Sequence, residues 1–174
     1  DQIELQFAKE DGRMKVINRV TQHTVVEEVR PVSYEKNRTC LNLKEQPDEY
    51  FYGGGVQNGR FSHKGKSIAI VNQNSWTDGG VASPTPFYWS TAGYGFMWYT
   101  FKPDKYDFGA TQKGEVSLSH ETNYLDVFFM INDGAVPLLN DFYQLTGNPV
   151  LLPKFGFYQG HLNAYNRDFW KEDE

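Results

Sequence analysis

The sequence contains a single cysteine, Cys40, among 174 residues, and this excludes an internal disulfide framework. A lone cysteine fills a core position more often than it performs chemistry, so we expect Cys40 to have a structural role. The spacing of histidines and cysteines that a metal site requires is also missing, so we predict neither a metal nor another cofactor. The histidines, which we expect at the surface or in hydrogen bonds, are His23, His63, His120 and His161.

Long apolar runs and clustered basic residues are absent as well. No run of about 18 apolar residues occurs, and the chain does not open on a charged and then apolar leader, so neither a spanning helix nor a signal peptide is predicted. The formal net charge is −5 and the basic residues are scattered, whereas phosphate binding needs lysine and arginine gathered on one face. We therefore expect no nucleic-acid partner and no membrane partner.

Aromatic residues, in contrast, are abundant at 16%, and they occur together with 16 glycines and 8 prolines. This composition favours short strands joined by tight turns. Apolar and polar side chains alternate in the runs 3–7, 14–20 and 24–29, and Asp11-Gly12 lies between the first two runs as a hairpin turn. The beginning of the chain therefore predicts an antiparallel meander.

Further strands are indicated along the next 80 or so residues at the regular spacing of an all-β domain. In the segment 50–55, "YFYGGG", an aromatic strand joins three glycines, so the backbone there must take unusual dihedral angles or allow a close approach. The other runs bounded by turn residues are 66–71, 86–90, 93–101, 105–109, 115–119 and 124–131. This spacing predicts a β-sandwich.

The pattern changes from strand to helix at residue 134. Apolar residues recur at steps of three and four, Gly147 stands in the stop position, and Pro149 bars continuation, so one amphipathic helix is predicted. The apolar positions of this helix are Val136, Leu139, Phe142, Tyr143 and Leu145.

Behind this helix, a short apolar strand leads into a polar segment that Asp168 could cap as a new helix. A strand, a loop and a helix start are the first unit of a β/α architecture, and we expect the rest of it to be absent from this chain. The predicted domains are a β-sandwich over 1–133, a linking helix over 134–149, and the first strand and loop of a truncated barrel over 150–174.

One segment combines side chains that could contact a sugar. The stretch 72–90, "NQNSWTDGGVASPTPFYWS", mixes Trp76 with Asn72, Asn74 and Asp78. The apolar faces of sugars stack on aromatic rings, while amides and carboxylates can each hold two hydroxyls. The alternative is a long turn in which Asp and Asn satisfy the loop's own backbone, and composition alone favours neither interpretation.

A resemblance to a known family bears on this choice. The segments "YFYGGGVQNGRFSHKGK", "PFYWSTAGYGFMWYT", "KYDFG", "LDVFFM" and "FYQLTGNPVLLPKFGFYQ" resemble, in order and spacing, glycoside hydrolase family 31, the α-glucosidase and α-glucosyltransferase family. The likeness covers about residues 50–160. More narrowly, "GGGVQNGRFSHKGK" with "NSWTDGGVASPTP" looks like a bacterial subgroup that transfers glucosyl and isomaltosyl groups. A bacterial protein, either cytoplasmic or secreted, fits this likeness.

The resemblance implies a mainly β fold, a galactose-mutarotase-like β-sandwich, followed by one helix and the start of a (β/α)8 barrel. It implies a parent enzyme that is a retaining α-glycosidase, such as an α-glucosidase, an isomaltosidase or a transglucosidase, acting on an oligosaccharide substrate. The family's two catalytic aspartates lie downstream of its first barrel strand and match no residue here. We therefore expect this chain to be inactive without its missing catalytic barrel.

The resemblance also implies a role for the stretch 72–90. In the family, the loop at this place reaches over the barrel mouth and binds sugar hydroxyls through an aspartate. Asn74 stands where that aspartate is usual, which keeps hydrogen bonding but loses the charge, and Asp78 is an alternative counterpart. In the segment after the first barrel strand, Tyr165 is the counterpart of a pocket tyrosine, although "GHLNAYNRD" departs from the family pattern. The expected substrate-binding residues are thus Asn74, Trp76, Asp78 and Tyr165.

Two other functions remain open on the sequence. A free-standing, non-catalytic carbohydrate-binding module would need no barrel. A mutarotase acting alone is the weakest reading, because the sequence offers no identifiable acid and base pair.

Overall fold

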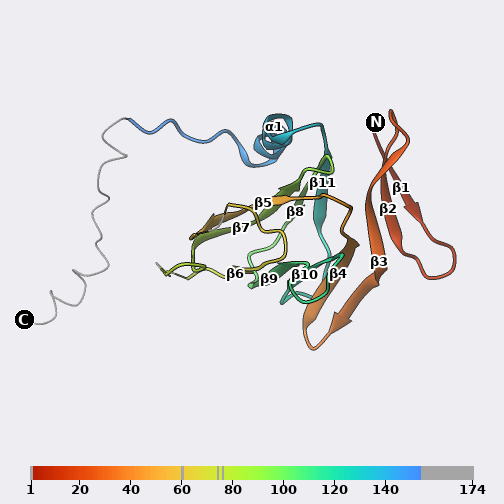
Figure 1. Ribbon diagram of the computed structural model, residues 1–174, viewed down its shortest axis with the longest axis horizontal. Coiled ribbons are helices and arrows are strands. Elements are labelled where there is room, and N and C mark those ends of the chain that lie inside the picture. The colour runs from red at the N-terminus through yellow and green to blue at the C-terminus, as the bar shows by residue number, and fades with distance from the viewer. Residues whose placement is uncertain (1, 60, 74, 76, 154–174) are drawn as a thin grey trace, which may run out of the picture. The chain divides into compact units, whose positions relative to one another are not determined.

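The computed structural model describes residues 2–59, 61–73, 75 and 77–153, and it shows a mainly β fold (Figure 1). The chain divides into two compact units, Asp1–Phe142 and Tyr143–Glu174, and each is described by itself. The first unit holds all of the strands that the structure describes, in two antiparallel sheets. In the described part of the second unit, the last turn of a helix is followed by residues 147–153 without regular structure. The predicted barrel strand lies outside the described residues, apart from its first positions.

The larger sheet has seven strands in the order β1-β2-β3-β4-β10-β9-β6. The first four are antiparallel neighbours, so the predicted meander and the hairpin at Gly12 are confirmed. The strands are β1 Ile3–Phe7, β2 Met14–Asn18, β3 His23–Glu35, β4 Arg38–Lys44, β6 Ser67–Ile70, β9 Asp104–Phe108 and β10 Glu115–His120.

Two strands of this sheet differ from the sequence prediction. Strand β3 is 13 residues long, more than twice the predicted run, and it continues past Pro31. Its register with β4 shifts twice, around Arg30. These irregularities let the first half of β3 pair with β2 and the second half with β4. Strand β4, with Cys40 half-buried in it, was not among the predicted runs.

The smaller sheet has four strands in the order β11-β8-β7-β5. They are β5 Phe51–Gln57, β7 Val81–Ser90, β8 Tyr94–Trp98 and β11 Val127–Ile131. The predicted strand 93–101 therefore ends three residues early, at Trp98. Thr100 accepts a hydrogen bond from the Lys102 amide at 3.1 Å, and Pro103 has no amide to donate, so the chain turns out of the ladder here.

The main core lies between the two sheets, and aromatic rings fill much of it. From the smaller sheet come the buried Phe51, Tyr88, Phe96 and Trp98, and from the larger sheet Tyr106 and Phe108. Tyr88 makes ring contacts with five neighbouring aromatic residues: Phe51, Tyr94, Phe96, Tyr106 and Phe108. This two-sheet core confirms the predicted sandwich.

A single helix in the described chain, α1 Ala135–Thr146, covers the outer face of the smaller sheet with its first two turns (Figure 1). Leu138 is buried there against Phe87 and Met130, and the Phe87 ring stacks on that of Phe142 at 4.1 Å. The predicted helix is confirmed, but its predicted apolar face is partly wrong. Val136 remains 69% exposed, because Leu138 rather than Val136 faces the sheet.

The helix ends at Gly147 as the sequence predicts. Gly147 has a positive φ of 86°, and its amide donates to the Tyr143 carbonyl at 2.8 Å. Within the described residues no helix is long and apolar enough to cross a membrane.

Candidate functional site: the β6–β7 loop and the hollow beside it

The segment between β6 and β7, residues 71–80, is a loop held by one residue from elsewhere in the chain. Asn58, in the turn after β5, accepts a hydrogen bond from the Gly79 amide at 2.8 Å and donates its own amide to the Gly80 carbonyl at 2.8 Å. Its side-chain Nδ2 also donates to the Ser75 carbonyl. Ser75 in turn donates its amide to Val81 at 3.1 Å. Asn58 therefore fastens both ends of the loop tip and gives it a defined conformation.

The glycines of β5 place Asn58 where it can do this. Gly53, Gly54 and Gly55 all have positive φ, at 109°, 77° and 76°, and the register with β7 shifts within this run. A Cβ on Gly55 would lie 2.0 Å from the Ser83 carbonyl oxygen, which no side chain could tolerate. The predicted close approach at "GGG" is thus a contact between the strands β5 and β7, and it brings the turn that carries Asn58 against the loop.

Of the four predicted substrate-binding residues, the structure describes one. Asp78 is exposed at the loop tip, and its Oδ1 lies so close to Gly59 that a Cβ there would overlap it. Asn74, Trp76 and Tyr165 lie outside the described residues, so their role in substrate binding stays a prediction. Next to them, Asn72, Gln73 and Thr77 are exposed on the same loop.

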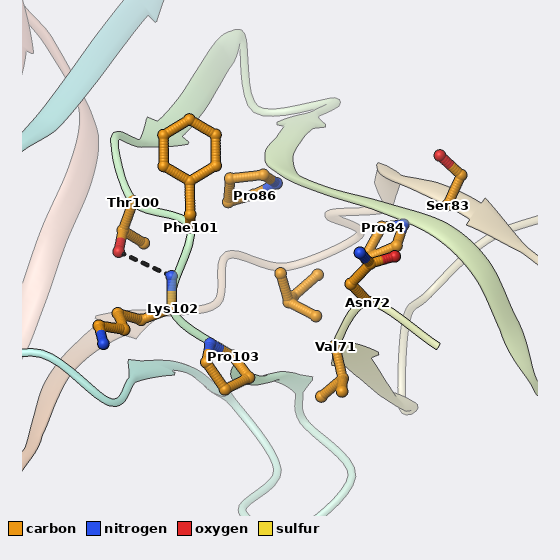
Figure 2. A pocket seen from close by; sticks show the side chains of 10 residues that line it. Val71, Asn72, Ser83, Pro84, Pro86, Thr100, Phe101, Lys102 and Pro103 are labelled. Atoms are coloured by element: carbon orange, nitrogen blue, oxygen red, sulfur yellow. Dashed lines mark hydrogen bonds between the residues drawn. The ribbon is translucent and has the colours of Figure 1, made fainter. Parts of the chain in front are cut away.

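Beside the loop lies a hollow of about 490 Å³ (Figure 2). Three segments form it: the end of β6 with Asn72, the middle of β7, and the turn after β8. The residues that line it are Ile70, Val71, Asn72, Ser83, Pro84, Pro86, Thr100, Phe101, Lys102 and Pro103. We call it the Phe101 hollow, because the Phe101 ring, which is 99% exposed, stands at its edge.

Two buried side chains of the larger sheet fix the walls of this hollow. His120 contacts the Lys102 carbonyl through Nδ1 at 2.7 Å and the Tyr106 hydroxyl through Nε2 at 2.9 Å. A carbonyl can only accept, so Nδ1 carries the proton and Nε2 accepts from Tyr106. The Tyr106 hydroxyl also lies 3.4 Å from the carbonyl of Pro86 on the opposite wall. The Tyr106–His120 pair thus holds the Lys102 wall by a hydrogen bond and packs behind the Pro86 wall.

Burial determines the charge state of this pair. It lowers the pKa of His120 below its usual 6.5, because the charged imidazolium loses its hydration. It also raises the pKa of Tyr106 well above its usual 10.0. Both side chains are therefore neutral near pH 7, and the imidazole remains in the tautomer that its neighbours require.

The described side chains of the loop and of the hollow are mostly amides, hydroxyls and apolar groups. Within the described residues, the side chains that line the hollow include no carboxylate, and no group of three or more His, Cys, Asp or Glu residues gathers closely enough to hold a metal ion. The arrangement offers amides, hydroxyls and an aromatic ring in a hollow with proline in its walls.

Sequence reasoning missed two of the residues that build this site. Asn58 stands in a turn, where asparagine is common for local reasons, and its spacing from the loop carries no signal. Phe101 belongs to an aromatic run that reads as ordinary strand packing. In the sequence, only Pro103 indicates that the strand ends before this ring. In the structure, β8 ends at Trp98, and Phe101 lies beyond it.

The sandwich, its outer helix and the fastened loop define the class of this domain. Residues 1–107 match the glycosyl hydrolase 31 N-terminal galactose mutarotase-like domain. The chain belongs to this family, and the family predicted from the sequence is confirmed.

The similar proteins include an α-xylosidase, a dextranase and a cycloalternan-forming enzyme. An α-xylosidase of Emericella nidulans is 28% identical over 130 residues, which are 72% of this chain and 16% of that protein. The structure of a family 31 dextranase of Flavobacterium johnsoniae, complexed with isomaltotriose, has a TM-score of 0.79 at 17% identity and covers 99% of this chain and 22% of its own.

The cycloalternan-forming enzyme of Listeria monocytogenes, in complex with a pentasaccharide substrate, has a TM-score of 0.77 at 21% identity, over 90% of this chain and 16% of its own. At these identities the two solved structures show the shared fold alone. The chain spans between 16% and 22% of the length of these three proteins.

Proposed function

We propose that this chain is the N-terminal domain of a retaining α-glycosidase or α-glucosyltransferase that acts on α-glucans or α-gluco-oligosaccharides, and that its β6–β7 loop forms part of the sugar-binding subsites. Asn74, Trp76 and Asp78 contact the sugar from the loop, and Tyr165 from the start of the barrel. The catalytic carboxylates belong to the barrel of the same polypeptide. One of them attacks the anomeric carbon, and the covalent glycosyl intermediate then passes to water or to another sugar.

The observation that carries this proposal is the way Asn58 holds the loop. Its three hydrogen bonds, to Ser75, Gly79 and Gly80, satisfy loop backbone from outside the loop. The exposed Asp78 is therefore not needed to satisfy the loop's own backbone, as the simple turn interpretation requires. A loop fixed in this way loses little conformational entropy when it binds a ligand.

The relatives support the class of substrate but leave its sugar open. The dextranase was solved with isomaltotriose and the cycloalternan-forming enzyme with a pentasaccharide substrate, whereas the similar protein from Emericella nidulans is an α-xylosidase. We favour α-glucans because the loop of this chain resembles that of the glucosyl-transferring subgroup.

The test is steady-state kinetics of the full-length enzyme with Asp78→Ala and Trp76→Ala. Each variant should lower kcat/KM for oligosaccharides by about 5- to 100-fold, the consequence of losing one to a few kcal/mol of polar or aromatic contact. Glu10→Ala, which removes an exposed carboxylate in the β1–β2 turn, is the matched control and should leave kcat/KM unchanged. Unaltered kinetics in both loop variants would remove the loop from the substrate site.

The alternative function is a free-standing, non-catalytic carbohydrate-binding module. The length of the open reading frame distinguishes this module from the first proposal. A frame that stops near Glu174 favours the module, and a frame that continues for several hundred codons with a downstream aspartate motif favours the enzyme.

A further inference from the structure

Phe101 is an aromatic ring whose exposure is unusual for its surroundings. The ring is 99% exposed, yet the backbone around it is held on several sides. Thr100 Oγ1 accepts the Lys102 amide at 3.1 Å and lies 3.1 Å from the Tyr124 hydroxyl, and the carbonyl of Lys102 contacts His120 at 2.7 Å. The nearest ring, that of Tyr99, has its centroid 6.5 Å away. A fixed segment thus presents a large apolar side chain to solvent, which is a common property of binding surfaces.

The hollow next to this ring combines apolar walls with free polar groups. Proline rings at 84, 86 and 103 and the aliphatic side chains of Ile70 and Val71 line it. Two polar side chains of the lining, Asn72 and Ser83, are exposed and form no hydrogen bond with the described residues. Figure 2 shows Phe101 beside Pro86, Asn72 next to Pro84, and the Lys102 side chain extending away from the hollow.

This chemistry selects a class of ligand. A cation would require a carboxylate, which the lining lacks, and an anion would require an inward-facing positive charge. An amide and a hydroxyl at the rim suit a neutral ligand with many hydroxyl groups, and a phenyl ring with prolines suits a ligand with a flat C–H face. A pyranose ring has both properties. The volume of about 490 Å³ also falls within the range of small-molecule pockets.

We propose that the Phe101 hollow is a sugar-binding subsite, in which one pyranose unit of a neutral oligosaccharide stacks on Phe101 and hydrogen-bonds to Asn72. The inference rests on the proposed function and deepens it, because Asn72 begins the loop that carries Asn74 and Asp78. It adds a binding surface on the β7 and post-β8 side of the loop. The wall at Lys102 needs little rearrangement on binding, since His120 already holds its carbonyl by a hydrogen bond.

The experiment is a titration of the ¹⁵N-labelled 174-residue chain with isomaltotriose, followed by amide chemical shifts. Saturable, millimolar binding should move the amides of Val71, Asn72, Phe101 and Lys102. Sorbitol has hydroxyls but no ring face, so the same concentrations of it should leave these amides in place. Phe101→Ala should weaken isomaltotriose binding about two- to tenfold, the loss expected for one aromatic contact.

Phe7→Ala is the matched control, because Phe7 is exposed on β1, at the opposite edge of the larger sheet from β6. It should bind isomaltotriose like the unchanged chain. The inference is overturned if the four amides do not move, as expected if further polypeptide and not sugar covers the hollow. It is also overturned if Phe101→Ala binds as tightly as the Phe7 variant. Either result leaves the loop proposal standing, because that proposal is tested separately by Asp78→Ala and Trp76→Ala in the full-length enzyme.

Discussion

Replacing Gly55 by alanine should destabilise the chain far more than the same replacement of Gly12. The two glycines have almost the same positive φ, 76° and 78°. An alanine costs about 1–2 kcal/mol in this left-handed region at either position. At Gly12 the new Cβ meets nothing within 4 Å. At Gly55 it would lie 2.0 Å from the Ser83 carbonyl oxygen and 2.7 Å from the Thr85 nitrogen, so the strands β5 and β7 must separate.

The extra cost at Gly55 is that of overpacking, about 1–3 kcal/mol. Urea unfolding of the 174-residue chain, monitored by tryptophan fluorescence, gives the free energy of unfolding of both variants. We expect Gly12→Ala to lose about 1–2 kcal/mol and Gly55→Ala to lose at least about 1 kcal/mol more. Equal losses in the two variants would refute the idea that the glycine run exists for the close approach of β5 to β7, and with it our explanation of how Asn58 reaches the loop.

Three further outcomes follow from the contacts of buried or clamping side chains. Asn58→Ala removes the bond from Nδ2 to the Ser75 carbonyl but keeps the backbone carbonyl of residue 58, to which the Gly79 amide donates at 2.8 Å. The variant should leave the fold intact but speed hydrogen exchange at the Gly79 amide, because the loop opens more easily without the Ser75 bond; unchanged exchange would show that the side chain does not fix the loop. Leu138→Ala should cost about 2–5 kcal/mol in unfolding free energy, because it opens a cavity beneath α1, and a loss below about 1 kcal/mol would place Leu138 outside the packed interface. His120 should make stability depend on pH, because burial lowers its pKa in the folded chain. Its contribution is present above the unfolded pKa of about 6.5 and is lost as the pH falls through the folded pKa, so His120→Gln should weaken the decline of unfolding free energy below about pH 6.5; an equally steep decline in the variant would contradict this.

The elements that sequence reasoning located are those whose signals are local. Alternation over a few residues revealed β1 and β2, and the glycine at 147 revealed the end of α1. The pairing of β6 with β9 and of β4 with β10 was not predictable in the same way. Those neighbours are far apart in the sequence, and their register depends on side chains that meet only in the assembled core.

The candidate site was likewise predictable only where its signal is local. The polar and aromatic composition of the loop pointed to Asp78, which the structure places at an exposed loop tip. The hollow beside the loop could not be predicted, because it is made where β6, β7 and the turn after β8 converge. The turn that carries Phe101 is bonded at Lys102 to a buried histidine, His120, that lies 18 residues beyond Lys102 in the chain.

The measurement that tests the central claim most directly is a crystal structure of the full-length enzyme with a bound α-gluco-oligosaccharide. Our account predicts ordered sugar within about 4 Å of the side chain of Trp76 or Asp78, with the loop leaning over the mouth of the barrel. Sugar bound in the barrel while the β6–β7 loop faces solvent on another side of the molecule would contradict it.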